Sequence, residues 1–205
     1  MPDTILFSLR DEADTRRWAS LLARSFAAIP LAEQAFAVHL SGDLGAGKTA
    51  LARFLLRELG FSGPVKSPTF TLLEPYNSPE LDVYHFDLYR FSSPEQWFDA
   101  GFDDIIASPG LSLIEWPQNA SGALPAPDLR LQLRALDAPA GSDDGADAGG
   151  CAEPASEPTP NTADDASDLA SGSSTARALR VQALSEAGQR CLSEIRHQWP
   201  GAATC

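Results

Sequence analysis

Short apolar blocks recur along the first 136 residues, and their spacing predicts strands alternating with helices. Residues 4–9 and 36–40 are apolar runs of the length and composition that form strands. Between them, residues 12–29 place apolar side chains along one helical face, and Asp11 is a suitable N-cap for that helix. Residues 48–59 repeat the helical pattern. The order strand, helix, strand, helix predicts an α/β fold.

The rest of the chain adds further strands and a closing helix. Residues 81–90 and 111–117 predict two strands, each carrying a carboxylate near its end, with a short helix between them. Residues 129–136 alternate apolar and polar side chains, which is typical of an antiparallel strand exposed on one face. Residues 177–184 are a plausible partner for that strand, and residues 185–198 predict a final helix.

Composition divides the chain into three parts. Residues 138–176 contain eight acids and no Lys or Arg, and they are rich in Ala, Gly, Ser and Pro, so we expect a disordered acidic insertion. We expect residues 1–137 to form the folded core, and residues 177–205 to supply a returning strand and a C-terminal helix of the same domain. The net charge of −13 falls to −5 outside the insertion.

Charge and cysteine usage limit the classes of function. The acidic balance argues against a nucleic-acid groove as the main surface. Cys151, Cys191 and Cys205 show no metal-binding spacing, and scattered thiols fit a reducing compartment. The N-terminus shows no signal-peptide pattern, and no apolar run reaches the length of a membrane span. We therefore expect a cytoplasmic protein that does not enter a membrane.

Residues 42–49, Gly-Asp-Leu-Gly-Ala-Gly-Lys-Thr, fit the P-loop pattern. They follow a predicted strand and open a predicted helix, the order in which loop amides and a helix N-terminus converge on an anion. Lys48 is placed to reach the β- and γ-phosphates, and the Thr49 hydroxyl to hold Mg²⁺. The segment predicts a nucleotide site; a glycine-rich turn without a ligand is the alternative.

Two later strands end in acids, at the edge where open α/β sheets bind ligands. Asp87 is the better-placed candidate for a Mg²⁺ site, although no continuous apolar run precedes it. For Glu115, the pattern alone favours a solvated charge at a strand end. His85 is a candidate for the site, but a histidine on a half-buried face is the favoured interpretation. Arg90 is a candidate phosphate or partner contact, with a surface salt bridge as an equal alternative.

A loop between the second helix and the next strand is a candidate sensor of the γ-phosphate. Thr69 and Thr71 offer two closely spaced hydroxyls beside the stiff Pro68. An ordinary Ser-Pro turn is an equal alternative.

Four motifs in one order make the chain resemble the TsaE (YjeE) family, over about residues 4–136 and again from about 177. They are Gly-Asp-Leu-Gly-Ala-Gly-Lys-Thr at 42–49, Lys-Ser-Pro-Thr-Phe-Thr-Leu at 66–72, His-Phe-Asp-Leu-Tyr-Arg at 85–90 and Ile-Glu-Trp-Pro at 114–117. The resemblance implies one P-loop NTPase domain of the α/β class, with a mixed, partly antiparallel sheet and flanking helices. The acidic insertion lies outside the family pattern.

The resemblance also implies a function. Family members are slow ATPases that bind ATP and Mg²⁺ and support the TsaB and TsaD proteins. That complex forms threonylcarbamoyladenosine beside the anticodon of tRNAs that read codons starting with A, so tRNA is reached indirectly.

The resemblance also implies a role for each residue of this sequence that matches a family motif. Lys48 and the loop residues Gly45, Ala46, Gly47, Thr49 and Ala50 are expected to bind phosphates, and Thr49 and Glu115 to ligate Mg²⁺. Asp87 is expected to orient water or the metal shell, and Thr69 to belong to the switch-like loop. Glu12 and Thr15 are candidates on the adenine side, and Arg177 is a further candidate.

Two departures from the family pattern and three alternative functions stand beside this hypothesis. Ala50 replaces a threonine that is usual in the family, which removes one hydroxyl but keeps the backbone amide. Gln96-Trp97 replaces Glu-Leu, which bears on partner contact.

A small-molecule kinase would need an arginine-rich lid, and the sequence shows no such cluster. A GTPase would need a base-reading motif, which the sequence also lacks. A nucleotide-gated binding module with negligible catalysis shares the same sequence features and stays open.

Overall fold

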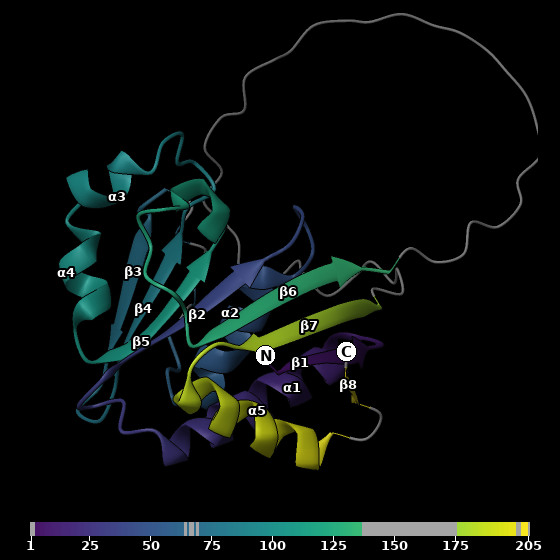
Figure 1. Ribbon diagram of the computed structural model, residues 1–205. Helices are drawn as coiled ribbons and strands as arrows, with labels where there is room; N and C mark the ends of the chain where they lie inside the picture. Colours follow the sequence, from purple (N-terminus) through teal and green to yellow (C-terminus); the bar gives the residue numbers. More distant parts are fainter. Residues whose placement is uncertain are drawn as a thin grey trace, which may run out of the picture.

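One mixed sheet runs through the computed structural model, which describes residues 3–63, 65, 68, 70–136, 176–199 and 202–204. The strand order is β3-β4-β5-β2-β6-β7-β1-β8 (Figure 1). The strands are β1 (Thr4–Leu9), β2 (Ala35–Ser41), β3 (Leu73–Asn77), β4 (Asp82–Asp87), β5 (Gly110–Glu115), β6 (Leu129–Ala135), β7 (Arg177–Ala183) and β8 (Ala203–Thr204).

Helices cover the sheet unequally. The α-helices are α1 (Glu12–Ser25), α2 (Lys48–Glu58), α3 (Glu95–Asp99), α4 (Phe102–Ala107) and α5 (Glu186–Gln198), with short 3-10 helices η1 (Phe26–Ala28) and η2 (Pro117–Ala120). The larger core lies between α1, α2 and α5 and one face of the sheet. A smaller core, centred on Trp97 and Phe102, joins α3 and α4 to the opposite face at β4 and β5. Helices therefore cover both faces of the sheet.

Strand directions confirm the mixed, partly antiparallel α/β sheet expected from the sequence. Strands β4, β5, β2 and β6 run parallel, whereas β3, β7, β1 and β8 pair in antiparallel fashion. The parallel strands β4, β5 and β2 are adjacent, so their carboxyl ends meet at one edge of the sheet. This edge receives the P-loop, which follows β2 directly.

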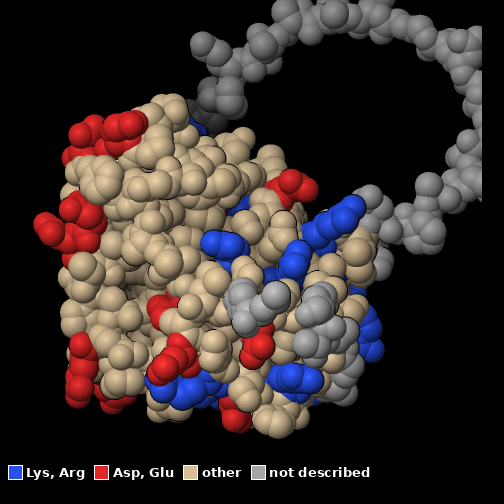
Figure 2. All heavy atoms as spheres, in the orientation of Figure 1, with Lys and Arg blue, Asp and Glu red and all other residues tan. Residues whose placement is uncertain are grey.

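The outer face of β6 and β7 carries basic side chains. Apolar residues of β6 alternate with exposed ones, because only one face of the strand meets the core. Arg130 and Arg134 of β6 and Arg180 of β7 are exposed. Figure 2 shows Lys and Arg gathered over these strands, and Asp and Glu along the edge formed by α3 and α4. Basic side chains thus predominate over β6 and β7, and acidic side chains along the α3–α4 edge.

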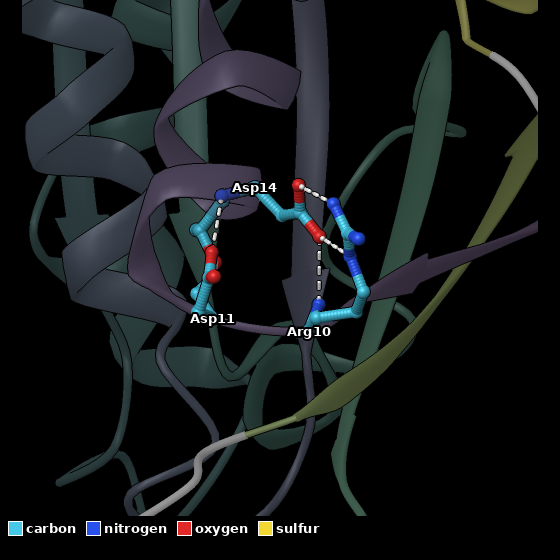
Figure 3. Close-up of polar contacts among 4 residues, drawn as sticks. Arg10, Asp11 and Asp14 are labelled. Carbon is cyan, nitrogen blue, oxygen red and sulfur yellow. Dashed lines mark hydrogen bonds and ion pairs between the residues drawn. The ribbon is translucent and has the colours of Figure 1, made fainter. Parts of the chain in front are cut away.

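The entry to α1 is fixed by its own polar residues (Figure 3). Asp11 caps the helix by accepting a hydrogen bond from the backbone N–H of Asp14, at 2.8 Å. The Asp14 carboxylate accepts from the backbone N–H of Arg10 at 3.0 Å and from its guanidinium at 2.7 and 3.1 Å. These hydrogen bonds to Arg10 hold the pKa of Asp14 below its usual value. The predicted N-cap is therefore confirmed.

Some sequence expectations need correction. The helix expected over 12–29 ends as an α-helix at Ser25 and continues only as the 3-10 turn η1. The strand expected over 129–136 is antiparallel to β7, as predicted, but parallel to β2 on its other side. Helix α4 and strand β8 were not predicted. All of the proposed acidic insertion at 138–176 except Ala176 lies outside the described residues. No helix of the described ranges is long and apolar enough to cross a membrane.

Candidate functional site

The P-loop forms a backbone cradle between β2 and α2. Gly45 and Gly47 have φ values of 76° and 97°, a left-handed conformation that glycine adopts without a steric cost. Gly47 precedes the first residue of α2 and offers no side-chain cap. The N–H groups of the first turn, from Lys48 to Ala50, therefore have no side-chain cap and point toward an anion site.

Lys48 is held at the mouth of this cradle. Its amine donates to the backbone carbonyls of Gly42 and Asp43, at 2.8 and 2.9 Å. The same amine lies 3.8 Å from the centroid of the Trp116 ring, a cation–π contact. Burial lowers the pKa of Lys48, while the negative charges of Glu115, Asp87 and Asp43 oppose that shift. The lysine is pre-positioned near the place where phosphates are expected.

The carboxyl ends of β4 and β5 bring two acids beside the P-loop helix. Asp87 and Glu115 are register partners on adjacent parallel strands, and both are buried, with exposures of 4% and 1%. Glu115 Oε2 accepts a hydrogen bond from Thr49 Oγ1 at 3.0 Å. The interpretation of Glu115 as a solvated strand-end charge is therefore wrong: the carboxylate is buried because α2 packs against that strand end.

These oxygen atoms fit the requirements of Mg²⁺. Adjacent ligands of an octahedral ion with bonds of about 2.1 Å lie about 3.0 Å apart. Thr49 Oγ1 and Glu115 Oε2 already have that separation of 3.0 Å. No group of three or more His, Cys, Asp or Glu side chains in the described ranges is arranged to hold a metal ion by itself, so an ion here would complete its shell with phosphate oxygens and water.

His85 lies beside these acids, so the favoured interpretation of a half-buried side chain is wrong and the alternative, a place in the site, is the one that agrees with the structure. Its exposure is 0%, and its Nε2 lies 2.9 Å from Glu115 Oε1. Sequence reasoning missed this contact because 30 residues separate the two positions. The available signal was the period-two spacing from His85 to Asp87, which places both side chains on one face of β4.

Arg177 reaches the P-loop from the start of β7. A Cβ built on Gly47 would lie 2.9 Å from Arg177 Nε, so the two residues are in close contact. The other weak candidates behave differently. The Glu12 carboxylate pairs with Arg16 at 3.3 Å, and the Thr15 hydroxyl donates to the Asp11 carbonyl at 3.1 Å. These contacts remain within the start of α1 and do not place either residue at the P-loop.

The remaining candidates also have defined positions, with one exception. Ala46 is buried, and Ala50 packs against the main core. Thr69 lies outside the described residues. Arg90, for which no role was settled, stacks over the exposed Phe70 ring at 4.5 Å, which is neither of the two alternatives considered from the sequence.

Backbone strain is concentrated around the same edge. Leu72 and Trp116 are the non-glycine residues of the described ranges with positive φ, at 64° and 57°. The Leu72 carbonyl accepts from the Asp87 N–H at 3.0 Å, and the Trp116 ring lies beside Lys48. Strained residues cluster at functional sites, where surrounding structure holds them in place. Their position supports this edge, in preference to the cavity of about 540 Å³ at the start of β2, as the site.

Comparisons with known proteins agree with this geometry. The family model described as "Threonylcarbamoyl adenosine biosynthesis protein TsaE" matches residues 9–140. The chain is 45% identical over 105 residues to the tRNA threonylcarbamoyladenosine biosynthesis protein TsaE of Haemophilus influenzae, covering 51% of this chain and 66% of that one. It is 37% identical over 127 residues to the protein of that name from Treponema pallidum, covering 62% and 89%.

A solved structure shares the fold. The crystal structure of Bacillus subtilis YdiB superposes with a TM-score of 0.62 at 23% identity, covering 97% of this chain and 99% of that one. Family match and fold agree with the P-loop geometry described above. The chain belongs to the TsaE family and has its mixed-sheet P-loop NTPase fold.

Proposed function

We propose that the chain is a slow, Mg²⁺-dependent ATPase that converts ATP to ADP and phosphate. The observation that carries the proposal is the contact between Thr49 and Glu115 at the mouth of the P-loop. It joins the hydroxyl of the loop motif to a buried carboxylate from a neighbouring strand, the two protein groups that hold Mg²⁺ in P-loop enzymes. Membership of the TsaE family supports the same activity.

Each side chain has a proposed role. ATP supplies the γ-phosphoryl group, and Mg²⁺ neutralises charge on its oxygens. Lys48 binds the phosphates, Arg177 adds positive charge beside Gly47, and Thr49 and Glu115 hold the ion. Asp87 orients water or the metal's water shell from the adjacent strand. The backbone amides of Gly45, Ala46, Gly47 and Ala50 contribute phosphate contacts.

Three assignments rest on the sequence pattern or the family resemblance, without a contact at the P-loop to support them. Thr69 is proposed as a contact from the switch-like loop, and Glu12 and Thr15 as adenine-side contacts. The relatives' names support a role in tRNA threonylcarbamoyladenosine biosynthesis. From the family resemblance we further propose that the chain supports TsaB and TsaD in forming threonylcarbamoyladenosine beside the anticodon of tRNAs that read codons starting with A. Contact with tRNA is then indirect, and a cytoplasmic location is expected.

The test is ATP hydrolysis by the purified chain, alone and with TsaB, TsaD and tRNA. We expect slow hydrolysis alone and a rise with the complex. Lys48→Ala and Glu115→Ala should each lower the rate about 100-fold or more, because each removes charge stabilisation of the transferred phosphoryl group. Glu58→Ala, at the exposed end of the same helix, is the control and should keep the wild-type rate.

Two outcomes would redirect the proposal. ATP binding without hydrolysis under any condition would favour the nucleotide-gated binding module. Wild-type turnover by Glu115→Ala would refute the proposed metal ligand. For Asp87→Ala we expect hydrolysis to fall more than ATP affinity; equal losses would instead assign Asp87 to binding.

A further inference from the structure

The Glu115 carboxylate is held from two sides. Oε2 accepts from the Thr49 hydroxyl at 3.0 Å, and Oε1 lies 2.9 Å from Nε2 of His85. His85 and Glu115 have exposures of 0% and 1%. We propose that His85 is a positioning residue that orients Glu115 for the metal ion. The inference rests on the proposed Mg²⁺-dependent function and extends it to a residue that does not itself touch the ion.

The sheet fixes this contact. Strands β4 and β5 are parallel, with His85 opposite Leu113 and Asp87 opposite Glu115. Side chains two residues apart on a strand share a face, so His85, Asp87 and Glu115 all point toward α2. The imidazole therefore lies two residues before Asp87 along β4. Its Nε2 contacts Oε1, the Glu115 oxygen that does not accept from Thr49.

Hydrogen bonding indicates which ring nitrogen of His85 donates to Glu115. An ionised carboxylate only accepts hydrogen bonds, so Nε2 must carry the hydrogen that points to Glu115. Nδ1 is buried and has no partner among the described residues. Nε2 is therefore the nitrogen that donates, and Oε1 of Glu115 accepts.

The consequence is a fixed carboxylate orientation. The last torsion of a glutamate is broad, so an unsupported carboxylate samples many rotations. His85 anchors Oε1, which leaves Oε2 facing Thr49 at the proposed ion position. Hydrogen-bond partners behind metal ligands typically change metal affinity by 10–100-fold when removed. Loss of the His85 donor should weaken metal binding while leaving the phosphate cradle intact.

Two substitutions separate hydrogen bonding from packing. His85→Gln keeps an N–H donor on a flexible chain, whereas His85→Met has similar reach without a donor and adapts to irregular core space. His39→Met is the matched control: His39 is also a buried histidine, but it lies on β2 and its pairing partners are on β5 and β6. Thermal unfolding of all three variants reports the packing cost separately.

The measurement is Mn²⁺ binding to each variant saturated with a non-hydrolysable ATP analogue, followed by electron paramagnetic resonance. Analogue affinity in EDTA is measured in parallel. We expect His85→Met to weaken Mn²⁺ binding about 10–100-fold, with metal-free affinity changed less than about twofold. His85→Gln should recover most of the Mn²⁺ affinity, and His39→Met should match wild type.

Wild-type Mn²⁺ affinity in His85→Met would overturn the positioning role. Equal weakening in His85→Met and His85→Gln would do the same, because it would trace the effect to ring packing. Failure of the wild-type chain to bind the analogue or Mn²⁺ at all would instead refute the proposed nucleotide function. The two failures are therefore distinguishable.

Discussion

A buried histidine should make the stability of this protein fall in mild acid. His39 lies on β2 with an exposure of 6%, opposite Arg130 in the register with β6. Its Nε2 has no partner in the described ranges. Burial, with a smaller contribution from the positive charge of Arg130, lowers its pKa from 6.5 to about 4. The folded protein thus holds this imidazole neutral where the unfolded chain would protonate it.

The sign and size of the effect follow from proton linkage. Between pH 6.5 and about 4 the unfolded state binds more protons than the folded state, so stability rises with pH across this window. For these pKa values, the loss relative to neutral pH is about 1 kcal/mol at pH 5.5 and about 2 to 3 kcal/mol at pH 4.5. For a chain of this length, 1 kcal/mol corresponds to about 2–4 °C in Tm.

The assay is urea unfolding at pH 7.5, 5.5 and 4.5 for wild type and His39→Gln. Glutamine does not titrate, so the variant should lose about 2 to 3 kcal/mol less than wild type between the first and last pH. His197→Gln, on the exposed side of α5, is the control and should follow wild type. Parallel pH profiles for wild type and His39→Gln would refute the reasoning, whatever their absolute stabilities.

Three further predictions concern the stability of the fold and the contribution of residues 138–175. Asp11→Ala should cost about 1 kcal/mol in thermal unfolding, because it removes the cap hydrogen bond at 2.8 Å; an unchanged Tm would contradict this. Gly188→Ala should cost about 1–3 kcal/mol, since a Cβ there would lie 2.2 Å from the Asp128 carbonyl oxygen, whereas Ala187→Gly serves as a nearby comparison. Replacing residues 138–175 with a short turn should leave ATP affinity unchanged, because Leu136 N–H already bonds the Ala176 carbonyl at 2.8 Å; weaker ATP binding in calorimetry would show that the segment contributes to the site.

The sequence predicted the local elements well, because their signals are local. Strand β2, the P-loop and helix α2 were placed nearly residue by residue from an apolar run, three glycines and a helical stripe. The pairing of β6 with β7 was also predicted. The parallel pairing of β6 with β2 was not, because alternation shows which face a strand buries but not which strands lie beside it.

The site was predicted less completely than the fold. Lys48 and Thr49 carry a sequence motif, so their positions beside a phosphate cradle were expected. The burial of Glu115 and the role suggested for His85 depend on contacts between residues 30 or more positions apart. No local pattern encodes such a contact. A lone histidine within a strand looks the same whether its neighbour is a leucine or a metal-binding carboxylate.

The present contacts of Lys48 bear on how nucleotide affinity arises. Its amine already has two carbonyl acceptors and an aromatic ring, and negative charge from Asp87 and Glu115 stabilises its ammonium form. A phosphate must replace those contacts, so the lysine contributes to binding only the difference in free energy between its present contacts and its contacts with phosphate. That difference is largest when charge develops on the transferred phosphoryl group. The geometry therefore favours a lysine that assists turnover more than ground-state binding, which agrees with the proposed ATPase activity.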